Sequence, residues 1–287
     1  MEARILDGRA LAAELRAGLT VRAAALHARG IAPRLLVVMV GEDESSLAYV
    51  RGMKSLGAKI GIHVVVEVLA GASNERAVNE ALERAAEDDD IHGVILQQPL
   101  PKHLSIRNIA GAVPERKDVD GTNPVNQGRL AFAMDTRFVP ATPAAVMLLL
   151  ERSAAWPLRG KSVVVVGRSS VVGLPVAFLV LAQNATVTIV HRETLEIAAR
   201  VRTADVVIVA TGRPGMVDAA WIRRGATVID VGTTVSDGKL RGDVDFESVR
   251  TVAGEITPVP GGVGPVTNVA LMRNVIAAAE CVAELVA

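Results

Sequence analysis

Three polar clusters interrupt the apolar stretches in the first half of the chain, and each holds side chains capable of chemistry. The first follows the apolar run 35–40 and contains Tyr49, the only tyrosine of the sequence. A tyrosine ring at the carboxyl end of a strand can stack on an aromatic ligand, although a lone tyrosine is more often part of ordinary packing. Met53 and Lys54 follow on the same predicted helix, and only the second of them carries a charge.

The second and third clusters add an amide and a carboxylate. Gln97 and Gln98 end an apolar run just before Pro99. Buried amides need hydrogen-bond partners, and a bound heterocycle can supply them. The third cluster is 117–121, Lys-Asp-Val-Asp-Gly, in which Asp120 lies on a turn. An exposed turn aspartate is the plainer interpretation of such a motif taken alone.

A different pattern in the second half of the chain predicts a nucleotide site. The apolar run 163–166 leads into a glycine-containing turn and then a helix. Backbone N–H groups at such a helix start can receive a phosphate. The glycine spacing differs from the six-residue dinucleotide fingerprint, so the motif alone is a weak signal. The residues predicted to meet the nucleotide here are Gly167, Arg168, Ser169, Val172 and Gly173.

The next predicted strand, 186–190, ends in His191 and Arg192. A dinucleotide fold places the residue that meets the adenine ribose near this point, where an acid favours NAD and an arginine suits a 2′-phosphate. Arg192 and Arg168 therefore favour NADP over NAD. Glu193 is a contrary sign, because an acid at this point favours NAD. The alternative interpretation is that Arg192 is an exposed surface charge with no role in binding. Two later strand ends are expected to border the same cofactor through Thr211, Gly212, Val231, Gly232 and Thr233.

The elements that must position these residues indicate an α/β fold. Helical stretches at 10–29 and 75–87 alternate with apolar, β-branched runs, as expected for βαβ units with buried parallel strands. The stretch 99–143 is rich in Pro, Gly, Asn and Asp and predicts a domain junction. We therefore predict a first domain at 1–140, with the helix 268–287 packing back on it, and a Rossmann-like NAD(P)-binding domain at 141–267. The predicted strands are 35–40, 64–68, 94–96, 163–166, 186–190, 206–209 and 227–231.

Composition narrows the class of protein. The chain has 287 residues, half of them apolar, which is enough for two hydrophobic cores. Its 31 basic and 31 acidic residues balance, so no net field attracts nucleic acid or a membrane, and a small-molecule ligand is expected. Cys281 is the only cysteine, which excludes an internal disulfide and fits a soluble cytoplasmic protein. The five histidines lack metal-site spacing, so no metal is predicted.

The motifs together resemble a known family over nearly the whole chain. They include Ser-x-x-Tyr-Val at 46–50, Gln97 ahead of Pro-Leu-Pro, Lys-Asp-Val-Asp-Gly at 117–121, and Gly-Arg-Ser at 167–169. The most specific is Thr-Pro-Val-Pro-Gly-Gly-Val-Gly-Pro at 257–265. The sequence is similar to the methylenetetrahydrofolate dehydrogenase/cyclohydrolase family, the bifunctional FolD type. The resemblance implies NADP-dependent oxidation of 5,10-methylenetetrahydrofolate to the methenyl form, followed by hydrolysis to 10-formyltetrahydrofolate.

The same resemblance implies roles for individual residues. A folate cleft would lie between the two domains, with Tyr49 stacking on the aminobenzoate ring, Asp120 binding the pterin amine and ring nitrogen, and Gln97 lining the reacting carbon. The protein would form a homodimer through its nucleotide domains. The substrate side of the pocket would be completed by Pro260, Gly261, Gly262 and Thr267.

One position departs from the family pattern. The family tyrosine is followed four residues later by a lysine, on the same helix face, and here that position is Met53. Lys54 lies about 100° further around the helix and should point elsewhere. The family lysine acts in hydrolysis, for which Met offers neither charge nor strong donor. Hydride transfer asks less of the protein.

We therefore predict a dehydrogenase whose cyclohydrolase activity is weak or absent. The nearest alternative keeps both activities, with Lys54 or another group replacing the lysine. A third alternative, of another class, is a catalytically silent folate-binding homologue.

Overall fold

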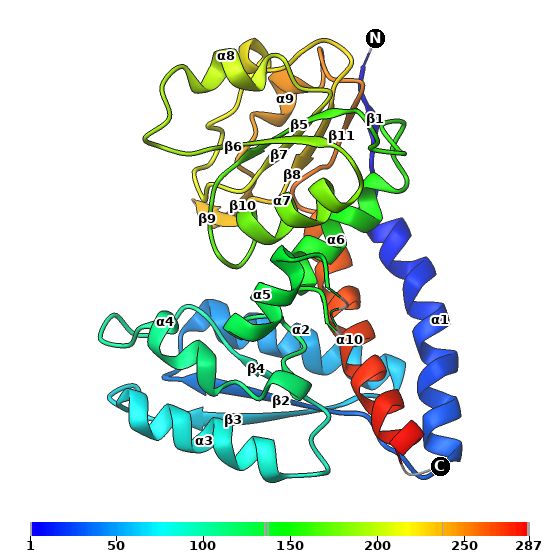
Figure 1. The fold of residues 1–287 in the computed structure, drawn as a ribbon, viewed down its shortest axis with the longest axis vertical. Coiled ribbons are helices and arrows are strands. Elements are labelled where there is room, and N and C mark those ends of the chain that lie inside the picture. Colours follow the sequence, from blue (N-terminus) through cyan, green and yellow to red (C-terminus); the bar gives the residue numbers. More distant parts are fainter. Residues whose placement is uncertain (1, 135, 137, 237, 286–287) are drawn as a thin grey trace. The chain divides into compact units, whose positions relative to one another are not determined.

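The computed structural model describes residues 2–134, 136, 138–236 and 238–285 (Figure 1). The chain divides into two compact units. The amino-terminal unit comprises residues 14–141 and 268–287. The carboxyl-terminal unit comprises residues 1–13 and 142–267. Two long helices, α1 (Gly8–Ala28) and α10 (Val263–Leu285), each contain one of the boundaries between the units.

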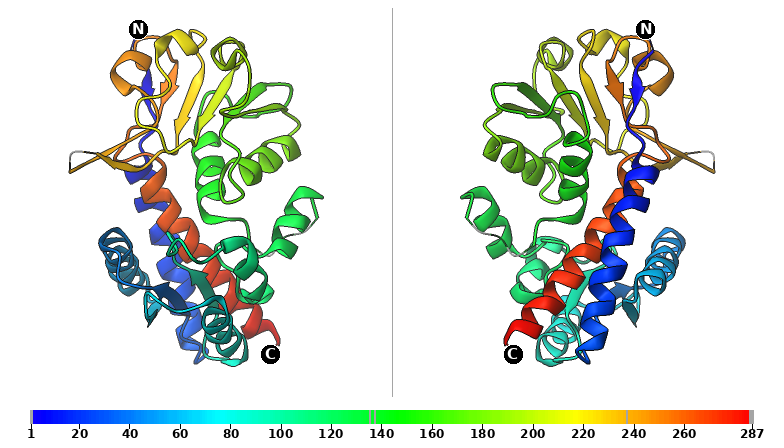
Figure 2. Two further views of the ribbon diagram at one scale, coloured as in Figure 1. Left: turned by 90° about the vertical axis from the view of Figure 1, so that its left-hand side faces the viewer. Right: turned by 90° about the vertical axis from the view of Figure 1, so that its right-hand side faces the viewer.

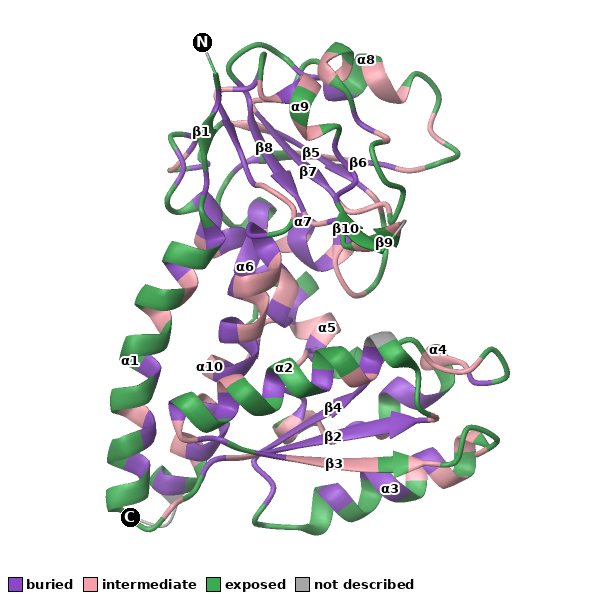
Figure 3. Cartoon of the chain, turned by 180° about the vertical axis from the view of Figure 1, so that it is seen from behind, coloured by how far each residue is buried: buried purple, intermediate pink, exposed green. Residues whose placement is uncertain are grey.

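A three-stranded parallel sheet forms the centre of the amino-terminal unit. Its order is β3 (His63–Leu69), β2 (Arg34–Val40), β4 (Gly93–Leu96), with Val37 paired to residues of both neighbours. Helix α2 (Glu44–Ile60) covers one face and α3 (Glu75–Glu87) covers the other (Figure 3). Because β2 and β4 are covered on both faces, they are apolar and buried along nearly their whole length, as parallel strands usually are.

Side-chain caps mark the starts of α2 and α3, and a glycine marks the end of α2. Asp43 caps α2 by accepting from the Ser46 N–H at 2.9 Å, and Asn74 caps α3 through the Ala77 N–H at 3.0 Å. Helix α2 ends at Gly61, whose φ of +99° lies in the left-handed region that glycine adopts without strain.

The stretch after β4 holds no strand in its described part. It forms α4 (Ile106–Ile109), two 3₁₀ turns at 110–112 and 115–117, and α5 (Pro124–Ala131). A lone backbone bridge joins Val94 of β4 to Asp118. This irregular segment therefore lies against the sheet without extending it as a strand.

The carboxyl-terminal unit has a six-stranded parallel sheet in the order β1-β11-β8-β7-β5-β6. From β5 the chain crosses to β6 on one side and then to β7 on the other, so the carboxyl end of β5 is a topological switch point, where such sheets bind their ligands. The strands are β1 (Arg4–Ile5), β5 (Ser162–Val166), β6 (Thr186–Val190), β7 (Val206–Val209), β8 (Thr227–Asp230) and β11 (Glu255–Ile256). The helices are α6 (Ala141–Leu150), α7 (Gly173–Ala182), α8 (Ile197–Val201), α9 (Phe246–Val249) and the 3₁₀ turn η3 (Ala219–Trp221).

Two features of this unit differ from the sequence-based expectation. Residues 1–13 belong here, because β1 pairs with β11 through the registers Arg4 to Glu255 and Ile5 to Ile256. A hairpin of β9 (Thr234–Ser236) and β10 (Lys239–Arg241) projects from the unit (Figure 2). Strands of two or three residues carry no periodic signal, so these short strands could not be predicted from local sequence.

Helix α10 is long and apolar. Its residues Val263–Glu284 have a mean hydropathy of 1.3, enough by length and composition to cross a membrane. Yet 67% of that stretch is buried inside the protein, which is typical of a core helix. Within the amino-terminal unit, α10 pairs with α1 through Arg22 and Glu280, whose side chains meet at 2.6 Å.

Candidate functional site

Tyr49 and Asp120 are brought together in the amino-terminal unit. Tyr49, on α2, keeps 38% of its surface exposed, so its ring can meet a ligand. Burial raises the pKa of the Tyr49 phenol, and the negative charge of Asp120 raises it further. The phenol therefore stays protonated at physiological pH, and it is close enough to the carboxyl to respond to its charge.

The carboxyl of Asp120 titrates near neutral pH. Burial raises the pKa of Asp120 to about 7, the charge of Asp118 raises it as well, and a hydrogen bond from the Ala141 backbone opposes both. A carboxyl with this pKa exists in both forms around pH 7, so it can accept a hydrogen bond as an anion or exchange a proton.

The residues around Asp120 hold it in place. Asp118 is fully buried and accepts from the backbone N–H groups of Thr122 and Asn123, both at 2.9 Å, and from the Asn126 side chain at 2.8 Å. Asn274 of α10 donates to the carbonyl oxygens of Val119 and Val139, each at 2.8 Å. These bonds fix the chain on both sides of Asp120.

Lys117 and Gly121, at the two ends of the same motif, have structural roles. The Lys117 ammonium donates to the carbonyls of Ala85 and Asp88, at 3.0 and 2.7 Å, and so caps the end of α3. Gly121 has a φ of +64°, and a Cβ there would lie 2.6 Å from Cγ of Pro140. Sequence reasoning singled out Asp120 in this motif and missed the positioning roles of its neighbours and of Asn274.

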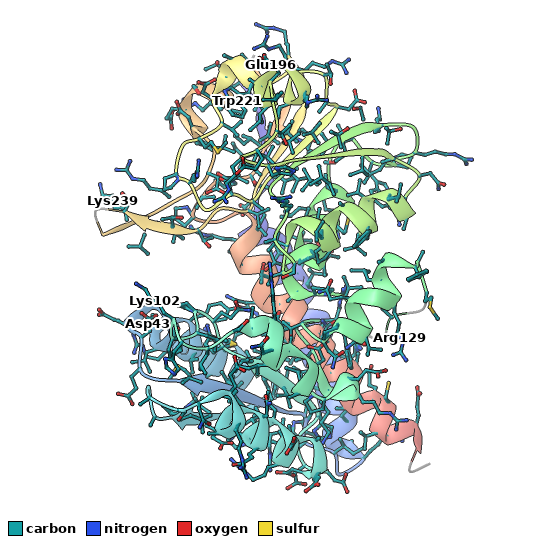
Figure 4. All side chains as sticks on the ribbon, turned by 60° about the vertical axis from the view of Figure 1, so that its left-hand side comes forward. Asp43, Lys102, Arg129, Glu196, Trp221 and Lys239 are labelled. Carbon is teal, nitrogen blue, oxygen red and sulfur yellow. The ribbon has the colours of Figure 1, made fainter. Side chains whose placement is uncertain are left out.

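Gln97 lies at the carboxyl end of β4 and is buried, with 9% of its surface exposed. Its side-chain N–H donates to the Gln98 carbonyl at 2.6 Å. The Ser46 hydroxyl meets the same carbonyl at 3.5 Å, and Asp43, labelled in Figure 4, caps α2 beside it. The end of β4 is thus tied to the start of the helix that carries Tyr49.

Met53 and Lys54 occupy different environments on α2. Met53 is completely buried, in a stripe with Val50, Gly57 and Ile60 that faces the core. Lys54 is exposed to solvent, as expected for a residue 100° further around the helix. Position 53 therefore belongs to the core of this unit, whereas the Tyr49 ring one turn earlier is partly exposed.

The predicted nucleotide turn lies at the switch point of the second sheet. Gly167 has a φ of +126°, and a Cβ there would overlap the Ala210 carbonyl oxygen; a Cβ at Gly173 would overlap the Gly167 carbonyl. Both glycines are therefore needed for the close approach of backbone segments. Ser169 accepts from the N–H groups of Val172 and Gly173, at 3.2 and 3.3 Å, at the start of α7. Arg168 is exposed beside this turn.

Two buried carboxylates organise the loops that follow β7 and β8; Asp230 belongs to a strand end that the sequence predicts to border the cofactor, whereas the sequence predicts no role for Asp243. Asp243 is fully buried and accepts from the N–H groups of Thr211 and Gly212, at 2.5 and 2.9 Å. Asp230 accepts from the N–H groups of Gly232, Asp243 and Val244. Burial raises the pKa of Asp230 to about 6, with the charge of Asp243 adding to it.

Asp230 ends an apolar run two residues before Gly232, and this was the signal available in the sequence; Asp243, which follows Gly242, has no such run before it. Around this point Val231 is half-buried, Gly232 is buried and Thr233 is exposed.

The residues after β6 lie where an adenine ribose is expected. His191 accepts from the Glu193 N–H at 3.3 Å, and its own N–H donates to the Thr194 hydroxyl at 3.0 Å. Arg192 is exposed and forms an ion pair with Glu193 at 2.9 Å. The arginine is available at the surface, but a neighbouring carboxylate competes for it.

The glycine-proline loop lies in the carboxyl-terminal unit. Gly261 has a φ of +115°, and a Cβ at Gly8 would overlap the Gly262 carbonyl, so the start of α1 packs directly on this loop after Pro260. Thr267 donates to the Val263 carbonyl at 3.2 Å within α10. Among the residues that the structure describes, no three His, Cys, Asp or Glu side chains are grouped to hold a metal ion.

Comparisons with known proteins agree with this arrangement. Residues 6–120 match the catalytic domain of tetrahydrofolate dehydrogenase/cyclohydrolase, and residues 140–283 match its NAD(P)-binding domain. The chain is 46% identical to the bifunctional protein FolD of Parafrankia over 276 residues, covering 96% of this chain and 99% of the relative.

Two solved structures are similar over the same length. One is the bifunctional FolD enzyme of Campylobacter jejuni, with a TM-score of 0.94, 35% identity and coverage of 97% of this chain and 99% of that one. The other is the Trypanosoma brucei enzyme complexed with NADP and an inhibitor, with a TM-score of 0.93, 38% identity and 99% coverage of both chains. This chain belongs to the tetrahydrofolate dehydrogenase/cyclohydrolase family.

Proposed function

We propose that the chain oxidises 5,10-methylenetetrahydrofolate with NADP⁺ and hydrolyses the methenyl product to 10-formyltetrahydrofolate. The observation that carries the folate part is the pairing of a partly exposed Tyr49 ring with the Asp120 carboxyl in one unit. The relatives named bifunctional, at 42–46% identity over the full length, support both half-reactions.

In this proposal the amino-terminal unit holds the folate. The Tyr49 ring stacks on the aminobenzoate group, and Asp120 accepts hydrogen bonds from the N–H groups of the pterin in its ionised form. Gln97, tied to the start of α2 through the Gln98 carbonyl, presents its amide near the reacting carbon. These groups position the substrate, and positioning is the main contribution that the protein makes to hydride transfer.

The carboxyl-terminal unit holds NADP, which accepts the hydride. The backbone at the start of α7 and the Ser169 hydroxyl suit the pyrophosphate. The exposed guanidinium groups of Arg168 and Arg192 suit the 2′-phosphate. Asp230 and Asp243 fix the loops that border the cofactor by accepting their backbone N–H groups.

One observation favours a second candidate, a dehydrogenase without cyclohydrolase activity. Met53 replaces the family lysine and is completely buried, so it can neither polarise the methenyl carbon nor accept a proton from water. Lys54 is exposed on another part of the helix. In the bifunctional proposal, Lys54 or another group must take over the role of the missing lysine.

A single time course separates these candidates. Purified protein receives methylenetetrahydrofolate and NADP⁺, and NADPH and the methenyl product are followed separately. Consumption of the methenyl product faster than in buffer supports the bifunctional enzyme. Accumulation in step with NADPH supports the dehydrogenase alone, and no NADPH contradicts both. The variant Lys54→Met, with Lys59→Met on the same helix as its control, tests whether Lys54 serves hydrolysis.

We also propose a homodimer formed through the carboxyl-terminal units. The hairpin of β9 and β10, on which Figure 4 labels Lys239, exposes 66% of Val235 and 39% of Leu240. Exposed apolar side chains on a short, unpaired ribbon favour pairing with a second copy. Light scattering should give twice the chain mass of 30.0 kDa, and Val235→Asp should reduce it toward the single-chain value.

A further inference from the structure

A cavity in the carboxyl-terminal unit is lined by none of the residues proposed to bind folate or NADP. It has a volume of about 360 Å³ and opens at the amino ends of the parallel strands, whereas the candidate cofactor residues follow their carboxyl ends. Its charged lining residues come from the starts or approaches of five strands, and they are Arg4, Lys161, Asp205, Arg223, Arg224 and Glu255.

The two carboxylates of this cavity are already paired with other groups of the protein. Glu255 is buried and is bound by the Arg4 guanidinium, by the Ala154 N–H at 2.8 Å and by the Thr227 hydroxyl at 3.0 Å. Asp205 forms an ion pair with Arg223 at 2.6 Å and also accepts from the Ser162 N–H at 2.9 Å. Two of the four cations are thereby neutralised.

The other two cations leave the cavity with an excess of positive charge. Lys161 is half-buried just before β5, and Arg224 is exposed just before β8. Within the described part of the chain, neither side chain has a hydrogen-bond or ion-pair partner. The cavity therefore offers two free cations on a rim whose acids are already paired, which is an electrostatic arrangement suited to an anion.

We infer that this cavity binds a small phosphorylated molecule, with its phosphate between Lys161 and Arg224. An arginine matches two phosphate oxygens at once, and a lysine adds a point charge, so the pair suits a dianion better than a monovalent anion. The volume lies within the range of roughly 300–1,000 Å³ that is usual for ligand pockets, which leaves room for an organic group beside the phosphate.

The test measures thermal stability, because a ligand that binds only the folded state raises the melting temperature. The probes are inorganic phosphate and glycerol 1-phosphate, compared with potassium chloride at equal ionic strength. We expect both phosphates to raise the melting temperature by about 2 °C or more at saturation. A larger shift with glycerol 1-phosphate identifies a monoester site, and equal shifts identify a site for phosphate alone.

Variants locate the binding. The double variant Lys161→Gln/Arg224→Gln should lose the shift and keep the KM for NADP⁺. The matched control Arg168→Gln/Arg192→Gln removes the cations proposed for the cofactor and should keep the shift. The inference is overturned if neither phosphate shifts the wild type, or if the shift survives in the first variant. Since the readout is binding, it stands independently of catalytic activity.

Discussion

Replacing Asp118 by alanine tests whether the buried network beside Asp120 holds the folate side of the site together. The Asp118 carboxylate is fully buried and is the acceptor for Thr122, Asn123 and Asn126. Two of these donors, the Asn123 N–H and the Asn126 amide, are themselves in buried residues, so water cannot replace the lost acceptor.

The expected cost follows from those unmet donors. Leaving a buried donor without a partner costs about 1–3 kcal/mol, so two of them predict a loss of roughly 3–5 kcal/mol in the free energy of unfolding. Asp118→Asn keeps the shape and one acceptor oxygen, and it should cost about half as much. Removing the charge of Asp118 also lowers the pKa of Asp120, because that charge contributes to raising it.

Urea unfolding followed by circular dichroism measures the loss, and amide exchange at 117–131 locates it. The matched control is Asp90→Ala, which removes an exposed ion pair with Arg34 and should cost less than about 1 kcal/mol. If Asp118→Ala is no less stable than this control, the network does not stabilise the unit. If Asp118→Asn leaves the pH dependence of the folate KM unchanged, the two carboxyls do not interact as argued.

Further predictions concern single positions. Gly232→Ala should abolish NADP⁺ binding or folding, because its Cβ would overlap Asp243, whereas Gly18→Ala in the open middle of α1 should stabilise the protein by about 0.5–1 kcal/mol in thermal unfolding. Arg192→Ala should raise the KM for NADP⁺ and leave that for NAD⁺ unchanged in steady-state assays. The folate KM should fall as pH rises through about 7, where Asp120 ionises, and Asp120→Asn should remove that dependence. Because its folded pKa is raised, Asp120 contributes stability below its unfolded pKa and loses it as pH rises through 7, which pH-dependent urea unfolding measures.

The longer strands of the fold could be predicted from local sequence. The run 206–209 coincides with β7, because a fully buried parallel strand is a continuous apolar segment. The run 186–190 coincides with β6, an edge strand that is marked by its β-branched residues although only Val190 is buried. The two-residue strands β1 and β11 could not be predicted, since their pairing joins Arg4 to Glu255 across most of the chain. No local pattern records so distant a partner, and the domain assignment of the first thirteen residues depends on it.

The same limit applies to the candidate site. Asp120 could be selected from its motif, but Asn274 supports it from a helix more than a hundred residues away, through the carbonyls of Val119 and Val139. Asp230 lies at a predicted strand end, but the backbone hydrogen bonds that it and Asp243 accept from the loops after β7 and β8 exist only in the folded chain. A residue whose side chain bonds to distant backbone groups has no local sequence pattern that reveals this role.

We propose that position 53 determines how efficiently this chain hydrolyses the methenyl product. Position 53 faces the core of the amino-terminal unit, so methionine suits it, whereas a lysine there must bring its amine out of the core to reach water. In the proposed function, Tyr49, Gln97 and Asp120 position the folate for hydride transfer. Hydrolysis needs a charged group or proton acceptor as well. In this proposal the residue at position 53 affects the second step, while the other three residues bind the substrate.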